Sequence, residues 1–305
     1  MRILFMGTPA PAAKCLQALL DAGEQIVAVV TQPDQKAGRG LKITEPPVKQ
    51  LAKQYHIPIE QPEKLKEIDK LRAYDPELIV IVAYGKILPK ELLEIPKYGA
   101  INVHASLLPK YRGAGPIQWA ILNGEKETGI TIMQVVQELD AGDILLQKKI
   151  PIAPDDTSET LSEKLFALGT ELLIDAVGKI KRGTITGTKQ KDHEATMAPQ
   201  LMKEAGEIDF RKTAEEVHNQ IRALIPWPTA HTFYHGKILK LLKSEIVANK
   251  KGLPGEILET DKGFTVSCRD AALKITEVQM EGKRKMAASD FISGHKLKEM
   301  DILPS

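Results

Sequence analysis

The stretch ELIVIVAYG at residues 77–85 decides the expected fold. It is a continuous apolar run, which is typical of a strand buried on both faces in a parallel sheet. Along the first half of the chain, helical patterns alternate with similar apolar runs, and this alternation indicates an α/β fold. We therefore predict a Rossmann-like, mostly parallel sheet with helices on both faces. The expected strands are residues 3–7, 25–30, 77–85, 99–105 and 128–136, and the expected helices are residues 10–22, 47–55, 63–73 and 158–182.

The second half of the chain has a different pattern. Residues 184–206 are polar and show no periodicity, as expected of an interdomain linker. Thr213 and Glu216 then fit a capping box at the start of a short helix. Short strand-like runs follow, with turn signals about every 8 to 12 residues, which indicates a small, closed, OB-like β-barrel. The expected domains are a catalytic domain at residues 1–188, a linker at 189–207 and a barrel domain at 208–305.

The composition excludes several classes of protein. Of the 305 residues, 43% are hydrophobic and 27% are charged, which argues against a disordered or fibrous chain. The longest apolar run, residues 78–84, is far shorter than the roughly 18 residues of a membrane-spanning helix. Gly7, Thr8 and Pro9 interrupt the first apolar run before a secretory signal could form, so we expect a cytoplasmic protein. The net charge of +2 argues against indiscriminate nucleic-acid binding but leaves local basic patches possible.

Cysteine and glycine patterns exclude three further kinds of site. Cys15 and Cys268 lie far apart without metal-ligand spacing, so we expect buried thiols rather than a disulfide or a zinc site. The first strand and turn, ILFMGTPAP at residues 3–11, contains only Gly7 of a dinucleotide-binding fingerprint. No P-loop sequence occurs. Neither a dinucleotide cradle nor P-loop chemistry is therefore expected.

The segment AINVHASLLPKYRGAG at residues 100–115 carries the strongest functional signal. Side chains alternate along a strand, so Asn102 and His104 lie on one face, opposite Ile101 and Val103. A buried parallel strand is normally apolar on both faces, and burial of unpaired polar groups is costly. The pattern therefore indicates either a hydrogen-bonded structural network or a functional site, and the spacing is compatible with both.

A second candidate segment is QVVQELDAGD at residues 134–143. Asp140 and Asp143 flank a small Ala-Gly turn, where carboxylates usually cap the local backbone. We expect the preceding strand to end at the same sheet edge as the strand that carries His104, and open α/β sheets bind ligands at that edge. A local cap and a ligand site are both consistent with this placement.

Three of these motifs together resemble the 10-formyltetrahydrofolate-dependent formyltransferases. They are NVHASLLPKYRGAGPIQWAI at residues 102–121, ETGITIM at 127–133 and LDAGD at 139–143. The signature of this family is an Asn-x-His strand, an SLLP segment and a downstream Asp. The resemblance implies a formyl transfer from 10-formyltetrahydrofolate to an amine.

Three further segments are similar to the members of this family that formylate initiator methionyl-tRNA in translation initiation. They are TQPDQKAGRG at residues 31–40, VAYGKILPKELL at 82–93 and IRALIPWP at 221–228. The resemblance thus extends from the first strand to the barrel. It departs from the family at Ala10-Pro11, where an acidic-aromatic pair is expected, and at Met197, where an aromatic residue usually precedes Ala-Pro.

The resemblance implies roles for named residues. Asn102 and His104 would donate hydrogen bonds to the oxygen that becomes negative in the tetrahedral species. Asp140 would assist proton transfer from the attacking amine and orient His104. Neither a metal nor a covalent acyl-enzyme is implied. The implied folate-binding residues are Ser106, Leu107, Leu108, Pro109, Val82, Tyr84, Gly85, Ile87, Leu88, Val136 and Gly142.

The insertion at residues 32–47 carries charges of both signs, which is also typical of an ordinary solvated loop. The resemblance implies that this insertion enters the acceptor end of the tRNA, with Arg39 as the strongest candidate. The barrel adds lysines interleaved with strand residues, which could contact an RNA backbone or simply form a solvated face. The expected tRNA-binding residues are Lys36, Arg39, Lys42, Lys237, Lys240 and Lys243, and we expect a monomer.

Three other functions are compatible with the sequence. A formyltransferase for a small amine, such as a ribonucleotide or an amino sugar, would share Asn102, His104 and Asp140 but should lack the basic insertion and the barrel. A hydrolase could use water in place of the amine and release formate. A non-catalytic RNA-binding protein would keep the basic surfaces, but it would not need polar residues at the sheet edge.

Overall fold

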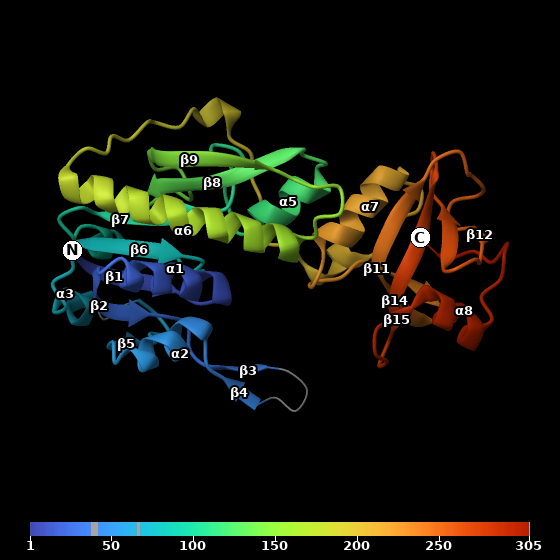
Figure 1. Ribbon diagram of the computed structural model, residues 1–305, viewed down its shortest axis with the longest axis horizontal. Coiled ribbons are helices and arrows are strands. Elements are labelled where there is room, and N and C mark those ends of the chain that lie inside the picture. The colour runs from blue at the N-terminus through green and yellow to red at the C-terminus, as the bar shows by residue number, and fades with distance from the viewer. Residues whose placement is uncertain (38–41, 66–67, 305) are drawn as a thin grey trace. The chain divides into compact units, whose positions relative to one another are not determined.

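The computed structural model describes residues 1–37, 42–65 and 68–304 (Figure 1). The chain divides into two compact units. The first unit consists of Met1–Pro116, Glu127–Ile150 and Ser162–Pro199, and the second of Ile117–Lys126, Pro151–Leu161 and Gln200–Ser305. The domain boundaries at residues 188 and 208 stay a prediction from the sequence. Among the described residues, no helix is both long enough and apolar enough to cross a membrane.

The first unit is built on a seven-stranded sheet of order β5-β2-β1-β6-β7-β8-β9. The strands from β5 to β7 pair in parallel, whereas β8 is antiparallel to β7. The expected α/β class and mostly parallel sheet are therefore confirmed. The strands are β1 (Arg2–Gly7), β2 (Gln25–Val30), β5 (Ile59–Glu60), β6 (Leu78–Val82), β7 (Ala100–His104), β8 (Glu127–Gln134) and β9 (Ile144–Pro151).

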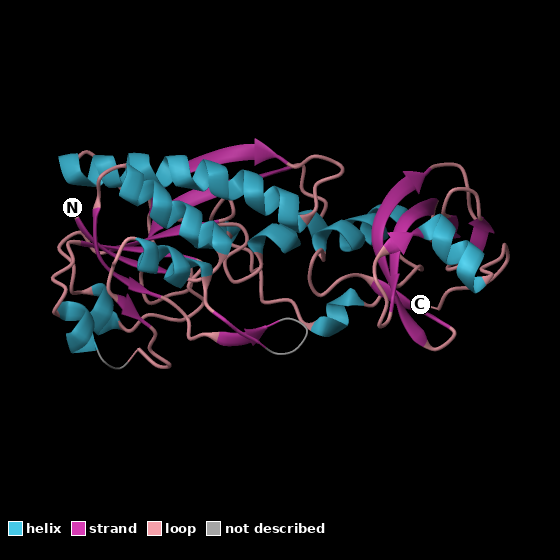
Figure 2. Ribbon diagram, turned by 60° about the horizontal axis from the view of Figure 1, so that its bottom comes forward, coloured by secondary structure: helices cyan, strands magenta, loops and turns pink. Residues whose placement is uncertain are grey.

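Helices cover both faces of this sheet (Figure 2). On one face, α1 lies beside α6, where the Cys15 thiol is 3.6 Å from the Thr170 hydroxyl. On the other face, Leu71 of α3 and Leu92 of α4 belong to an apolar cluster with residues of β1, β2 and β6. All five residues of β6 are buried, as the apolar run predicts. The helices are α1 (Ala10–Asp21), α2 (Pro47–Gln54), α3 (Ile68–Arg72), α4 (Lys90–Leu93) and α6 (Ser158–Arg182), and a hairpin of β3 (Gln35–Ala37) and β4 (Lys42–Thr44) precedes α2.

Close packing of α6 fixes the orientation of β7. A Cβ atom on Gly169 would lie 3.0 Å from Val103 of β7 and 3.4 Å from Ile130 of β8, so a larger residue would force these side chains to shift. Val103 therefore faces α6. Because side chains alternate along a strand, Asn102 and His104 point to the opposite face, as predicted.

The second unit contains an antiparallel sheet of six strands. Its core holds Phe264 and Phe291 together with Leu239 and Leu241 from one face of β11. The helices are α5 (Pro116–Leu122), α7 (Ala214–Ala223) and α8 (Ala288–His295). The strands are β10 (His231–Tyr234), β11 (Lys237–Val247), β12 (Ile257–Glu259), β13 (Phe264–Ser267), β14 (Ala272–Met280) and β15 (Met286–Ala287).

The sheet is curled into a half-barrel, which confirms the small OB-like β-barrel domain expected from the sequence, although the barrel is not closed as predicted. Among the described strands, the edge strands β10 and β12 do not pair with each other. Instead, a segment from outside the sheet forms main-chain hydrogen bonds with each edge strand. Ile208 donates its main-chain N–H to the carbonyl of His231 on β10 at 2.9 Å, and Ile257 of β12 donates to the carbonyl of Asp301 at 2.8 Å.

The predicted capping box at the start of α7 is confirmed. The Glu216 main-chain N–H donates to the Thr213 hydroxyl at 3.1 Å, and the Thr213 main-chain N–H donates to the Glu216 carboxylate at 2.8 Å. The second hydrogen bond holds the pKa of Glu216 below its ordinary value. Two main-chain N–H groups at the start of α7 therefore have hydrogen-bond acceptors within the capping box.

Replacing Thr213 by alanine should lower the free energy of unfolding by about 1 kcal/mol at neutral pH, the usual value for a lost N-cap. Because the pKa of Glu216 is lower in the folded protein than in the unfolded chain, its ionised carboxylate stabilises the folded protein at a pH above the ordinary glutamate range. This contribution is lost as the pH falls below that range. Thr213→Ala keeps the main-chain N–H that lowers the pKa of Glu216, so both proteins should lose this contribution in acid and the difference between their melting temperatures should largely persist. Thr213→Ser, which keeps the hydroxyl, is the matched control. Equal melting temperatures of wild type and Thr213→Ala at neutral pH would contradict the capping role.

Candidate active site

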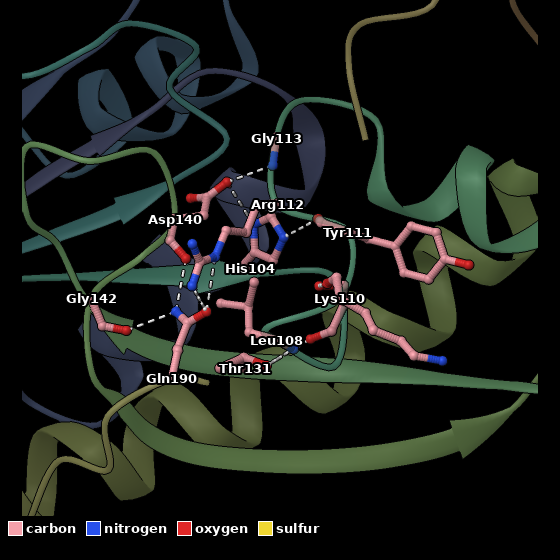
Figure 3. A network of polar contacts seen from close by, with 11 residues as sticks. His104, Leu108, Lys110, Tyr111, Arg112, Gly113, Thr131, Asp140, Gly142 and Gln190 are labelled. Carbon is pink, nitrogen blue, oxygen red and sulfur yellow. Dashed lines mark hydrogen bonds and ion pairs between the residues drawn. The ribbon is translucent and has the colours of Figure 1, made fainter. Parts of the chain in front are cut away.

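His104 ends β7 and is almost completely buried. Its Nε2 lies 2.9 Å from the main-chain carbonyl oxygen of Tyr111. A carbonyl oxygen can only accept a hydrogen bond, so Nε2 carries the hydrogen. On the other side of the ring, Nδ1 lies 3.5 Å from Oδ2 of Asp140 (Figure 3). A neutral ring would present a lone pair to the carboxylate, so this contact is attractive only when a proton lies between Nδ1 and Oδ2.

Asp140 is held in place by the loop that follows β7. The Gly113 main-chain N–H donates to Asp140 Oδ2 at 2.8 Å. The backbone of Asp140 is left-handed, with φ of 48°, a conformation that aspartate tolerates better than most residues. Two residues later, Gly142 lies so close to β8 that a Cβ atom would be 1.8 Å from the Gln134 carbonyl oxygen. Only glycine fits at this position.

The expectation that the strand before Asp140 ends at the same edge as His104 is wrong. Because β8 is antiparallel to β7, its last residue Gln134 pairs with Ile101, and Thr131 pairs with His104. The loop between Gln134 and Asp143 nevertheless brings Asp140 to His104. The two groups meet through the path of the loop and not through a shared sheet edge.

Asn102 lies between Ile81 of β6 and Met133 of β8 and is half-buried. Within the described part of the chain, its side-chain amide makes no hydrogen bond, so its N–H groups are available to a bound molecule. His104 differs, because its Nε2–H is already donated to Tyr111. Of the two donors expected from the resemblance, Asn102 has a free N–H, whereas His104 can act only through Nδ1, the atom that faces Asp140.

A hydrogen-bond network fixes the SLLP loop at residues 106–109. The Ser106 hydroxyl donates to the Lys110 carbonyl oxygen at 2.7 Å, and the Thr131 hydroxyl donates to the Ser106 carbonyl oxygen at 2.6 Å. Gln147 donates to the Leu108 carbonyl oxygen at 2.9 Å. Ser106 is fully buried, so its side chain supports the loop from behind. Leu107 and Pro109 are the half-exposed residues of this segment.

The other residues implied in folate binding fall into two groups. Val82, Tyr84 and Leu88 are buried, and burial raises the pKa of the Tyr84 hydroxyl to about 12. They can shape a pocket but offer little surface to a ligand. Ile87 is 84% exposed and Val136 is 43% exposed, so these two apolar side chains are accessible. Gly85 has φ of 80°, which favours glycine in the turn after β6.

Part of the predicted linker belongs to the frame of this site. The Arg112 main-chain N–H donates to the Thr196 carbonyl oxygen at 2.9 Å, and the Ala198 N–H donates to the Arg112 carbonyl oxygen at 2.7 Å. The Tyr111 N–H donates to the Thr196 hydroxyl at 2.9 Å. Residues 188–198 of the expected linker at 184–206 therefore pack against the first unit through hydrogen bonds. These contacts are mostly between main-chain groups, which leave no signal in the side-chain pattern.

The basic residues expected to contact tRNA occur in both units. Arg39 lies outside the described residues, whereas Lys36 and Lys42 belong to β3 and β4. In the second unit, Lys237 and Lys243 of β11 are exposed and Lys240 is half-buried. Lys243 pairs across the sheet with Glu277, whose carboxylate lies 3.2 Å from Lys285.

The base of the β3–β4 hairpin is anchored to α2. Lys49 of α2 contacts Asp34, just before β3, at 2.7 Å and Glu45, just after β4, at 3.3 Å. These contacts hold the pKa of the Lys49 ammonium above its ordinary value, with Asp34 as the main cause. The insertion therefore has a fixed base.

The expected buried thiols are confirmed. Cys15 and Cys268 are both free and buried, and burial raises their pKa values to about 11 and about 12. Such thiols are protonated at neutral pH and are poor nucleophiles. Among the described residues, no group of three or more His, Cys, Asp or Glu side chains could hold a metal ion.

Comparison with known proteins identifies the family of this chain. Residues 1–177 match the formyl transferase family model, and residues 200–296 match the model of the formyl transferase C-terminal domain. The methionyl-tRNA formyltransferase of Caldanaerobacter subterraneus subsp. tengcongensis is 49% identical over 99% of this chain and 100% of that protein. The methionyl-tRNA formyltransferase of Thermodesulfovibrio yellowstonii is 48% identical over 97% of both chains. This chain belongs to the methionyl-tRNA formyltransferase family.

Solved structures outside the methionyl-tRNA formyltransferase family share the fold. HypX from Aquifex aeolicus, solved in complex with tetrahydrofolic acid, has a TM-score of 0.68 and 20% identity over 100% of this chain and 51% of that chain. The sugar 3N-formyl transferase WlaRD, solved with dTDP and 5-N-formyl-THF, has a TM-score of 0.70 and 23% identity over 93% of this chain and 99% of that chain. At these identities the likeness supports the fold alone.

Replacing Gly142 by alanine should destabilise the first unit by about 3 kcal/mol, at the upper end of overpacking penalties, because the new methyl group would meet main-chain atoms of Gln134. Thermal or denaturant unfolding measures the loss. Gly294→Ala is the matched control, since a Cβ atom there would meet no other atom within 4 Å. An unchanged melting temperature of Gly142→Ala would show that the loop carrying Asp140 is not held against β8 as described.

Proposed function

We propose that this protein transfers the formyl group of 10-formyltetrahydrofolate to the α-amine of methionine on initiator methionyl-tRNA, and so supports translation initiation. The observation that carries the proposal is the 49% identity to a methionyl-tRNA formyltransferase over nearly the full length of both chains. The fold alone does not identify the acceptor, because a sugar formyltransferase shares it. The cytoplasmic location and the monomeric state stay predictions from the sequence.

The direct test offers the purified protein three acceptors with 10-formyltetrahydrofolate. Initiator methionyl-tRNA should give a formylated aminoacyl ester, an amino sugar nucleotide should give no product, and water alone should release little formate. Formylation of the amino sugar nucleotide but not of the tRNA would support the small-amine function. Formate release without a formylated acceptor would support the hydrolase.

In the proposed reaction, the neutral amine attacks the formyl carbon, and the electron pair of the carbonyl moves to its oxygen. Asn102 is the residue with free N–H donors to stabilise that negative oxygen. The carbon–N10 bond then breaks, N10 takes up a proton, and the new formamide nitrogen loses one. All bonds are exchanged between the two substrates, so no covalent acyl-enzyme is needed.

The His104–Asp140 pair is suited to the proton transfer. Because Nε2–H is donated to Tyr111, the ring has a fixed orientation and exchanges protons only at Nδ1, which faces Asp140. The pair can therefore take up the proton that the amine loses and return it to N10. General acid–base groups of this kind typically contribute roughly 10²- to 10⁴-fold in rate.

Asn102→Ala should lower kcat by roughly 10²- to 10³-fold, the usual loss for one oxyanion donor. Steady-state formylation of methionyl-tRNA measures the change, and circular dichroism shows whether the variant is folded. Asn102→Asp has nearly the same shape but replaces the N–H donors with acceptor oxygens, so it should be at least as slow. A folded Asn102→Ala protein with near-normal kcat would exclude the oxyanion role.

Binding of the tRNA should weaken with salt, because lysine contacts release counterions from phosphates. The expected slope is about 0.9 log units of affinity per log unit of salt for each phosphate neutralised on a duplex. Lys237→Ala and Lys243→Ala should weaken binding and reduce the slope, with kcat at saturating tRNA unchanged. Glu245→Gln, on the same strand β11, is the control and should not weaken binding. Salt-independent affinity would count against these lysines as tRNA contacts.

A further inference from the structure

The side-chain amide of Gln190 bridges two carbonyls of the loop that carries Asp140. Its Nε2 lies 2.8 Å from the Asp140 carbonyl oxygen and 2.8 Å from the Gly142 carbonyl oxygen (Figure 3). An amide nitrogen has two hydrogens, so each carbonyl receives one. Hydrogen bonds therefore hold the loop on both sides of Ala141.

Arg112 fixes the orientation of this amide. Its Nε and one terminal nitrogen donate to Gln190 Oε1 at 3.0 and 2.8 Å, and the same terminal nitrogen lies 2.8 Å from Asp192. A guanidinium can only donate, so Oε1 must face Arg112 and Nε2 must face the loop. The Arg112 side chain is mostly buried, whereas Asp192 is exposed. The guanidinium is therefore held from both sides.

The same short segment also holds the carboxylate of Asp140. Gly113, the neighbour of Arg112, donates its main-chain N–H to Asp140 Oδ2 at 2.8 Å. Residues 112–113 thus restrain the side chain of Asp140 directly and its main chain through Gln190. This restraint matters because Asp140 has a left-handed backbone, which persists only where its surroundings enforce it.

We propose that Gln190 is a positioning residue for formyl transfer, which keeps the Asp140 carboxylate within reach of His104 Nδ1. The inference rests on the proposed function. Gln190 acts through the main chain of residues 140–142 and does not contact the reacting atoms. It comes from residues 188–198, which the sequence presents as a linker. Formyl transfer therefore depends on a segment distant in sequence from the Asn-x-His strand.

The test uses Gln190→Ala in the full-length protein, with 10-formyltetrahydrofolate and initiator methionyl-tRNA. We expect kcat to fall roughly 10- to 100-fold, because small errors in the position of a reacting group are costly. The KM for methionyl-tRNA should change less than about twofold, because Gln190 contacts none of the expected tRNA-binding residues. Gln190→Glu keeps an oxygen for Arg112 but loses both donors, so it should lose at least as much. Thr186→Ala, an exposed change two residues before this segment, is the control and should have normal kcat.

A double-mutant cycle separates positioning from general destabilisation. If Gln190 acts through Asp140, Gln190→Ala combined with Asp140→Asn should be no slower than Asp140→Asn alone. Independent losses that multiply would overturn the proposal. So would a normal kcat in Gln190→Ala, or a loss explained entirely by its unfolded fraction.

A second measurement does not depend on the acceptor. The ¹⁵N chemical shifts of His104 report which ring nitrogen carries a proton. Without substrate, Gln190→Ala should move them toward the values of Asp140→Asn. A wild type that does not formylate methionyl-tRNA would refute the proposed function, while the shifts would still test the positioning role. Shifts of Gln190→Ala equal to those of the wild type would refute the positioning role.

Discussion

The contact between the His104 imidazole and the Asp140 carboxylate constrains the loops around the site. The two side chains come from segments that leave β7 and β8 at opposite ends, because these strands are antiparallel. The two ends of the loop from Gln134 to Asp143 lie together, and Asp140 within the loop has to reach His104. A main-chain hydrogen bond of 2.9 Å from Gln134 to Asp143 ties its ends, and the lack of a side chain at Gly142 permits the close approach.

This arrangement requires two residues in unfavourable backbone conformations. Tyr111 and Asp140 have φ of 63° and 48°, at a cost of about 1 kcal/mol or more each. Hydrogen bonds from the neighbouring segments offset the cost. The Tyr111 N–H donates to Thr196, and the carbonyl of Asp140 accepts from Gln190. The strain at the site is thus balanced by residues about fifty or more positions away in the sequence.

Structural features that depend on the pattern of side chains could be predicted from the sequence. The apolar run of β6, the alternation that places Asn102 opposite Val103, and the capping box at Thr213 follow from side-chain chemistry and are present in the structure. The direction of β8 could not be predicted, because an apolar strand reads the same in a parallel or an antiparallel pair. It was therefore not possible to derive from spacing how Asp140 reaches His104.

Main-chain contacts explain the other misses. Residues 188–198 pack through their backbone and through three polar side chains, Gln190, Asp192 and Thr196, which are not distinctive in a polar stretch. The open form of the second sheet has a similar cause, because residues near 208 and 301 take the edge positions that closure would have filled. Neither segment has the alternating pattern that identifies a strand.

The covered edges of the second unit also determine how this unit can meet other molecules. A sheet with a free edge can accept a strand from a partner, or from a second copy of itself, by main-chain pairing. Ile208 pairs with β10, and residues 300–303 pair with β12 and the residue before it. A partner of the second unit therefore has to bind the side chains on the faces of the sheet. Without the pairing of residues 300–303, β12 would present unpaired main-chain groups, and the second unit could then bind another strand while the site around His104 stayed unchanged.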